Sequence, residues 1–138
     1  MAQEHLWIDD VFEYYRDDVL EHVVVIEFHR NHTWQEYYLL LEAIYDFIDG
    51  QVDGMDYINI WHRRITLPAG KPTTHYQNMI GQFNSPFIVT VDYSRNRVMQ
   101  RLLLLVRGIL KLNVTFAPDV ETARDMIRLR REQSPAAD

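Results

Sequence analysis

Residues 23–26 are Val23-Val24-Val25-Ile26, an almost continuous apolar run that precedes the turn-forming sequence Asn31-His32. A run of this length and β-branched composition is typical of a central strand that is covered on at least one face. Thr33 and Glu36 then have the spacing of a capping box, which indicates the start of a helix. Behind them, apolar and aromatic residues recur every three or four positions, as in an amphipathic helix: Tyr37, Leu40, Leu41, Ile44, Tyr45 and Ile48. This part of the chain predicts a strand followed by a helix.

The same order of strand and helix is repeated toward the C-terminus. Runs rich in β-branched and aromatic residues predict three more strands, at 57–61, 87–91 and 112–116. Periodic apolar residues predict three more helices, at 73–83, 95–110 and from 119 onward. Before Val23, residues 11–15 and a turn at 16–18 predict a β-hairpin. Strands that alternate with single helices imply parallel crossovers, so we expect an α/β domain with a mixed, mostly parallel sheet of about five strands and with four helices.

The last two helices have inner faces that the spacing assigns. In the helix at 95–110 we expect these residues to face the core: Val98, Leu102, Leu105, Val106 and Ile109. In the last helix, which Asp119 should cap, the inner residues should be Val120, Ala123 and Ile127, with Met126 as a fourth candidate. This helix also has four arginines, which either complement the negative C-terminal end of its dipole or form a basic docking strip: Arg124, Arg128, Arg130 and Arg131.

The composition is that of one globular domain. The chain has 138 residues, of which 47% are hydrophobic and 25% charged. We expect an N-terminal segment at 1–10, a single domain at 11–132 and a flexible tail at 133–138. There are no cysteines, which excludes disulfides and thiolate chemistry. The longest apolar run, Leu102–Val106, is far shorter than the roughly 20 residues that cross a bilayer, and the first ten residues lack the lysine or arginine of a signal peptide. We therefore expect a cytoplasmic protein without a membrane partner.

The charge is negative and unevenly distributed. A net charge of −6 disfavours a nucleic-acid-binding protein. Residues 1–60 contain 14 acidic residues and two arginines, whereas residues 61–138 contain 12 basic and six acidic residues. These charges either mix in space on one domain or form complementary surfaces, which would favour a homodimer or steer a basic partner.

The element order resembles that of the STAS domain, also called the SpoIIAA-like or anti-sigma-factor-antagonist-like domain. The likeness covers roughly residues 11–130. It is carried by the hairpin that ends at Phe28, the helix start Thr33-Trp34-Gln35-Glu36, and the closing sequence Phe116-Ala117-Pro118-Asp119-Val120-Glu121-Thr122-Ala123. The resemblance implies a non-enzymatic regulatory or scaffolding module that binds a protein partner and needs no cofactor. Members of the family are switched by phosphorylation of a Ser or Thr that follows an Asp at the start of the second helix.

Thr73 and Thr74 stand at the corresponding helix start, where the Asp-x-Ser-Gly pattern of the family is absent. They are either helix caps or phospho-acceptors, and this helix end with its neighbouring loops is the expected contact edge. Trp34 and Tyr38 are expected to be partly exposed on the first helix. Exposed aromatic residues are enriched at protein interfaces, although half-buried core packing is an equally good interpretation.

A second interpretation is a small-ligand-binding protein or an enzyme. Five polar residues follow predicted strands, and ligands of open α/β sheets gather at the carboxyl ends of strands: His29, His32, His62, Asp92 and Ser94. Each of them is otherwise a turn or capping residue. An interaction module should have an exposed apolar patch, whereas an enzyme should gather these side chains around a concave site. The leading interpretation includes no catalytic residue, no metal and no cofactor.

Overall fold

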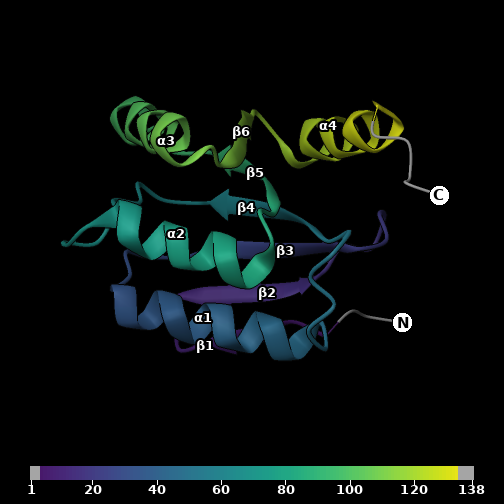
Figure 1. The fold of residues 1–138 in the computed structure, drawn as a ribbon, viewed down its shortest axis with the longest axis horizontal. Coiled ribbons are helices and arrows are strands. Elements are labelled where there is room, and N and C mark those ends of the chain that lie inside the picture. The colour runs from purple at the N-terminus through teal and green to yellow at the C-terminus, as the bar shows by residue number, and fades with distance from the viewer. Residues whose placement is uncertain (1–3, 134–138) are drawn as a thin grey trace.

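The computed structural model describes residues 4–133, which form a six-stranded sheet and four helices (Figure 1). The elements in chain order are β1 Leu6–Ile8, β2 Phe12–Arg16, β3 Val23–Phe28, α1 Trp34–Phe47, β4 Asp56–Trp61, α2 Pro72–Phe83, β5 Phe87–Asp92, α3 Arg97–Leu110, β6 Asn113–Ala117 and α4 Val120–Gln133. The α/β class is confirmed. The sheet has one strand more than the five expected, because three residues of β1 are too few to show a periodic pattern. Gln133 ends α4, and the rest of the tail expected at 133–138 lies outside the described residues.

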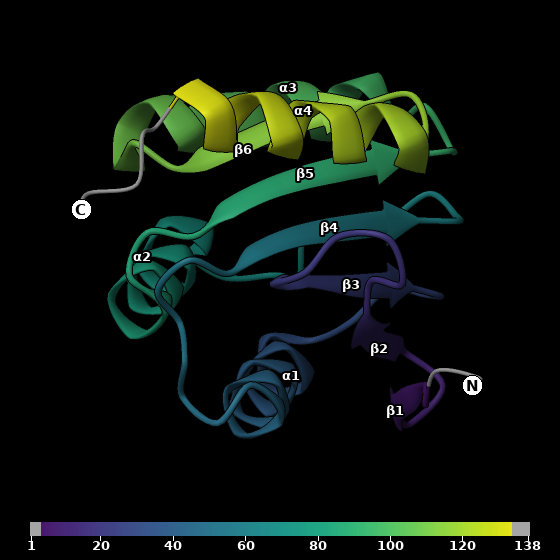
Figure 2. The ribbon, with the colours of Figure 1, turned by 90° about the vertical axis from the view of Figure 1, so that its right-hand side faces the viewer.

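The strands lie side by side in the order of the chain, from β1 to β6 (Figure 2). The first three strands pair antiparallel, and β3 to β6 pair parallel. The sheet is therefore mixed and mostly parallel, as predicted. In the parallel part, α1, α2 and α3 each connect two neighbouring strands.

The helices divide unequally between the two faces of the sheet. The larger core cluster joins one face to α1, α2 and α3, and includes Phe12, Leu40 and Phe83. The smaller cluster joins the other face to Ala123 and Ile127 of α4, as the sequence predicted. Alternation along each strand produces this division, because successive side chains point to opposite faces.

Local hydrogen bonds explain where two of the helices begin. Thr33 and Glu36 form the predicted capping box of α1. Asp119 accepts a hydrogen bond from the Thr122 amide at 2.7 Å, as expected for the cap of α4. Each bond satisfies a backbone amide that has no partner within the helix.

The expected inner face of α3 is wrong apart from Val106. The buried residues are Met99, Leu103 and Val106, whereas Val98, Leu105 and Ile109 are 62–71% exposed. The cause is Asn96, a buried N-cap whose side chain accepts from the Met99 amide and donates to the Ile65 carbonyl. Residues 96, 99, 103 and 106 share one side of the helix, so this anchored cap sets the side that faces the core.

Arginines of α4 attach this helix to the ends of distant strands. The Arg124 guanidinium binds the buried Asp17 carboxylate at 2.7 Å, just after β2. Arg131 binds Asp56 at 2.9 Å at the start of β4, and also donates to the carbonyls of Glu21 and His22. Arg124 and Arg131 are therefore partly committed to holding the fold together, which argues against a basic docking strip that uses the whole cluster.

Candidate functional site

One half of the sheet face that carries α4 is not covered by a helix among residues 4–133. The helix packs against β4, β5 and β6 and helps to bury Val23 and Val25 at the start of β3, so the same face stands open over β1, β2 and the carboxyl end of β3 (Figure 2). Alternation along the strands places a group of polar and aromatic side chains on this open face: His5, Trp7, Glu13, Tyr15, Glu27 and, just after β3, His29. His62 and Tyr93 follow β4 and β5 at the same edge.

Four aromatic rings from these strand ends stack in a row. The ring centroids are 5.0 Å apart for Trp7 and His29, 5.2 Å for His29 and His62, and 6.1 Å for His62 and Tyr93. The row follows the strand pairing, since Phe28 pairs with Trp61 and Trp61 with Asp92. The row of rings therefore runs along the carboxyl edge of the strands, from β1 to β5.

Two glutamates connect these rings. Glu13 contacts the ring nitrogens of His5 and His29, the latter at 3.0 Å. Glu27 contacts the Nε2 atom of His62 and accepts a hydrogen bond from the Tyr15 hydroxyl at 2.5 Å. Burial opposes ionisation of Glu13, but its hydrogen bonds with the two histidines outweigh that effect and lower its pKa. Burial, together with the hydrogen bond to Glu27, raises the pKa of Tyr15.

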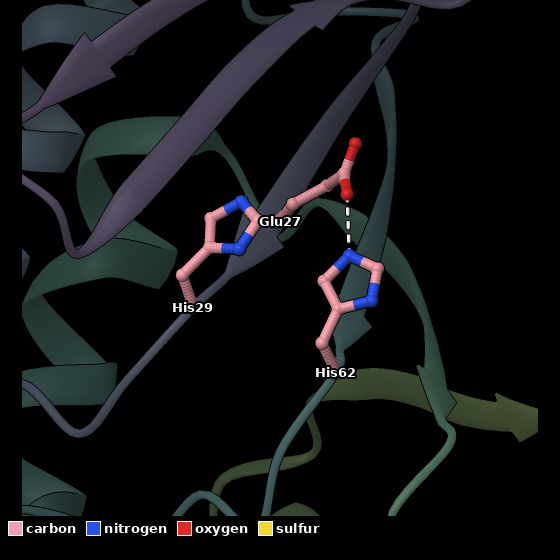
Figure 3. Close-up of side chains that lie close together, drawn as sticks. All are labelled: Glu27, His29 and His62. Atoms are coloured by element: carbon pink, nitrogen blue, oxygen red, sulfur yellow. Dashed lines mark hydrogen bonds and ion pairs between the residues drawn. The ribbon is translucent and has the colours of Figure 1, made fainter.

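Three of these side chains have the donor types and the spacing of a metal site. One ligand atom each from Glu27, His29 and His62 lies within 4.8 Å of the other two (Figure 3). The side chain of Glu27 is 15% exposed, and those of His29 and His62 are 30% and 40% exposed. The group therefore stands at the surface, with the carboxylate deepest.

The structure brings together two of the five strand-end residues predicted from the sequence. His29 and His62 are neighbours, but His32 lies on the opposite face of the sheet, packed against Phe12 and Phe28. The expected convergence of His32 with the other histidines is wrong, because the chain turns toward α1 after β3. Burial lowers the pKa of His32 to about 4.

Asp92 and Ser94 form a separate structure at the start of α3. Asp92 accepts hydrogen bonds from the Ser94 hydroxyl, the Asn96 amide and the Gln100 side chain. It is 8% exposed and belongs to the support of the helix cap. The expected convergence of Asp92 and Ser94 with the histidines is therefore not found, whereas their alternative interpretation as turn and capping residues fits these bonds.

Sequence reasoning missed the carboxylates of the open face. Glu27 interrupts the apolar run of β3, and Glu13 occupies the facing position of β2. Two glutamates at paired positions of neighbouring strands are the signal that could have located this surface, because like charges placed directly opposite destabilise a sheet. Here histidine rings contact both carboxylates.

The residues predicted from the STAS resemblance lie elsewhere, around the first turn of α2. Lys71 is the N-cap of this helix and makes no side-chain capping bond, so Thr73 and Thr74 lie inside the first turn and are not caps. Thr74 is exposed and Thr73 half-buried. Whether either is phosphorylated stays a prediction.

Trp34 is a core residue and not the partly exposed one expected. Its indole is 8% exposed and stacks on the His75 ring at 4.3 Å. The loop before α2 lies so close that a Cβ on Gly70 would meet the indole nitrogen at 3.2 Å. Tyr38 is half-buried, with its hydroxyl 2.7 Å from His75 Nδ1 and accepting a hydrogen bond from Asn78. Both aromatic residues therefore help to join α1 to α2.

A cavity of about 60 Å³ lies on the other side of the sheet, beneath the three helices. Its walls are mostly apolar, but they include three polar side chains with an atom that has no hydrogen-bond partner among the described residues: His32, Asn59 and Trp61. A space of this size holds a few water molecules, which commonly satisfy such atoms. It is too small for a metabolite.

The most exposed apolar surface is the outer side of α3. Val98, Leu102, Leu105 and Ile109 follow one another at spacings of four, three and four residues. This spacing is that of the contact line between two helices in a coiled coil. No helix of the described residues is both long enough and apolar enough to cross a membrane.

Comparisons with known proteins leave these surfaces unassigned. No family model, curated protein or solved structure matches the chain.

Proposed function

We propose that this protein is a non-enzymatic interaction module with a STAS-like fold, and that α3 docks an acidic amphipathic helix of a partner protein. The observation that carries the proposal is the outer side of α3, where Leu105 and Ile109 are each 62% exposed. Exposed apolar residues are unremarkable singly, but a contiguous row of them marks an interaction surface.

The spacing of these residues favours a helix as the partner. Val98, Leu102, Leu105 and Ile109 form a narrow line with a 3.5-residue repeat, which matches a facing helix in knobs-into-holes packing. Helices that lie in a membrane surface carry Trp and Phe as well as Leu on the apolar side. There is no aromatic residue in α3.

The charge around this line favours an acidic partner. The segment from 94 to 118 contains five basic residues and no acidic one: Arg95, Arg97, Arg101, Arg107 and Lys111. All five are exposed. A second copy of this chain would bring the same cations against one another, whereas glutamates beside an apolar line would pair with them.

The acidic remainder of the molecule fits the same arrangement. Residues 1–60 carry most of the negative charge, so a partner that is acidic along its whole surface would be repelled there. A partner that presents its acidic helix to α3 gains attraction from the cations there. The charge distribution therefore favours an encounter in which the partner's acidic helix faces α3.

The test uses a synthetic helical peptide with Leu and Ile at the apolar positions and Glu beside them, and a second peptide in which Lys replaces Glu. We expect the acidic peptide to bind at least about tenfold more tightly, and its binding to weaken as salt is added. The variant Leu105→Gln/Ile109→Gln should lose this binding. Leu39→Gln is the matched control, because Leu39 is 47% exposed on α1.

Three outcomes would overturn the proposal. Equal binding of both peptides would remove the charge argument. Sedimentation showing a dimer that Leu105→Gln/Ile109→Gln dissociates would make a second copy the occupant. Co-sedimentation with anionic vesicles that the same variant abolishes would make the occupant a lipid surface.

A further inference from the structure

We propose that Glu27, His29 and His62 bind a divalent transition-metal ion of the Zn²⁺ type on the open face of the sheet. This site is separate from the α3 surface and does not depend on the proposed docking. Two imidazoles and one carboxylate are an established zinc ligand set, and such a set leaves a position open for water.

The backbone holds the three ligands in fixed positions. Glu27 is in β3, His29 follows its last residue, and His62 follows the last residue of β4, the neighbouring parallel strand (Figure 3). Their ligand atoms lie within 4.8 Å of one another. In a tetrahedral site with bonds of about 2.0–2.1 Å, neighbouring ligand atoms are roughly 3.3 Å apart. Reaching that spacing requires the Glu27–His62 contact to lengthen and the two rings, which are 30% and 40% exposed, to rotate.

A second set of residues orients the ligands. Glu13 lies 3.0 Å from the Nε2 atom of His29, which leaves Nδ1 of the same ring free to face the ion. The Tyr15 hydroxyl donates to Oε2 of Glu27, which leaves Oε1 on the side of His62. Carboxylates bonded to the far nitrogen of a ligating histidine are the usual support of metal sites. Glu13 is placed to give His29 this support.

The donor types select among ions. Imidazole nitrogen favours zinc and its transition-metal neighbours, whereas Mg²⁺ and Ca²⁺ prefer an all-oxygen set. Binding requires the contact between His62 and Glu27 to open and any proton on the His62 Nε2 atom to leave for solvent. Protons and the metal ion compete for these nitrogens, so acid should weaken the binding.

The first experiment is calorimetric titration of the untagged, metal-free chain with ZnCl₂ and, separately, with MgCl₂. We expect one Zn²⁺ per chain and no saturable binding of Mg²⁺. Each of His62→Ala, His29→Ala and Glu27→Gln should weaken Zn²⁺ binding at least about tenfold. The matched control is His22→Asn, because His22 is an exposed histidine before the amino end of β3, with a positive φ of 60° that Asn tolerates.

Glu13, which contacts the far nitrogen of His29, provides a second test of the site. Glu13→Gln should lower the affinity about 10- to 100-fold while leaving the stoichiometry at one. X-ray absorption of the zinc-loaded chain should show two imidazole ligands in the wild type and one in His62→Ala. At a given concentration, Zn²⁺ should also raise the melting temperature of the wild type more than that of His62→Ala.

The proposal is overturned if zinc does not bind saturably, or if it binds equally to His62→Ala and Glu27→Gln. It is also overturned if His22→Asn removes the binding. Circular dichroism of each variant separates loss of the site from loss of the fold, and the conservative change Glu27→Gln keeps the test valid if an alanine variant does not fold.

Discussion

His32 is the residue with the clearest dependence on pH. It is 8% exposed between the rings of Phe12, Phe28 and Trp34, and burial lowers its pKa from 6.5 to about 4. The charge of Glu36 favours its protonation and that of Arg30 opposes it, but both effects are smaller than burial. His32 is therefore neutral in the folded protein at neutral pH.

The sign of the pH effect follows from the two protonation states. Between pH 6.5 and about 4 the unfolded chain binds a proton at His32 and the folded protein does not, so stability falls as the pH is lowered. The lowering of the His32 pKa corresponds to about 3 kcal/mol of unfolding free energy. We expect His32→Phe to lose less stability than the wild type between pH 7 and pH 4, as measured by urea denaturation. Parallel pH curves for the two proteins would contradict this explanation.

One of the ion pairs that attach α4 to the sheet is buried. Asp17 has a side chain only 1% exposed, and Arg124 is 15% exposed. Burial opposes ionisation of Asp17, but the hydrogen bonds from Arg124 and from the Leu20 amide outweigh it and lower its pKa. This contribution to stability is lost as the pH falls below the usual range of aspartate, a lower range than that of His32.

Arg124→Met should lower the unfolding free energy by about 3 kcal/mol, because it leaves the buried Asp17 carboxylate without its cation. Arg128→Met is the matched control on the same helix. Arg128 is 42% exposed and pairs with the exposed Asp125, so its loss should cost no more than about 0.5 kcal/mol. Chemical denaturation of both variants checks the difference. Equal losses of unfolding free energy in the two variants would show that the buried ion pair stabilises the fold no more than the exposed one.

The helix α3 shows what a pattern on one element can and cannot determine. The run Leu102-Leu103-Leu104-Leu105 places apolar side chains on every side of the helix, so periodicity allows more than one inner face. The choice is made by Asn96, whose buried hydrogen bonds reach Ile65 in a loop 31 residues away. Such a contact between distant segments is invisible in the sequence, which explains why the inner face was assigned wrongly while the helix itself was predicted.

At the scale of the whole molecule, local signals predicted the strands from 11 onward and all four helices. The capping box at Thr33 and the runs at Val23 and Tyr57 are signals of this kind, because the residues that cause them are adjacent in the chain. The strand β1 was missed, since three residues are too short for a periodic signal. The neighbourhood of His29 and His62 was predicted from parallel pairing, but Glu13 was not, because its position depends on the hairpin register.

The sheet order also predicts which parts of the molecule open first. β1 is a three-residue edge strand that pairs only with β2, whereas β4 pairs on both sides and is covered by helices on both faces. Amide exchange under native conditions should therefore be fastest in β1 and slowest in β4 and β5, because local opening of an edge breaks few buried contacts. Hydrogen exchange with mass spectrometry measures this order. Trp7 in β1 stacks on His29, so bound Zn²⁺ that holds the His29 ring should slow exchange in β1 more in the wild type than in His62→Ala at the same Zn²⁺ concentration. Protection of β1 equal to that of β4 without metal would mean that the edge strand is held by contacts beyond its pairing with β2.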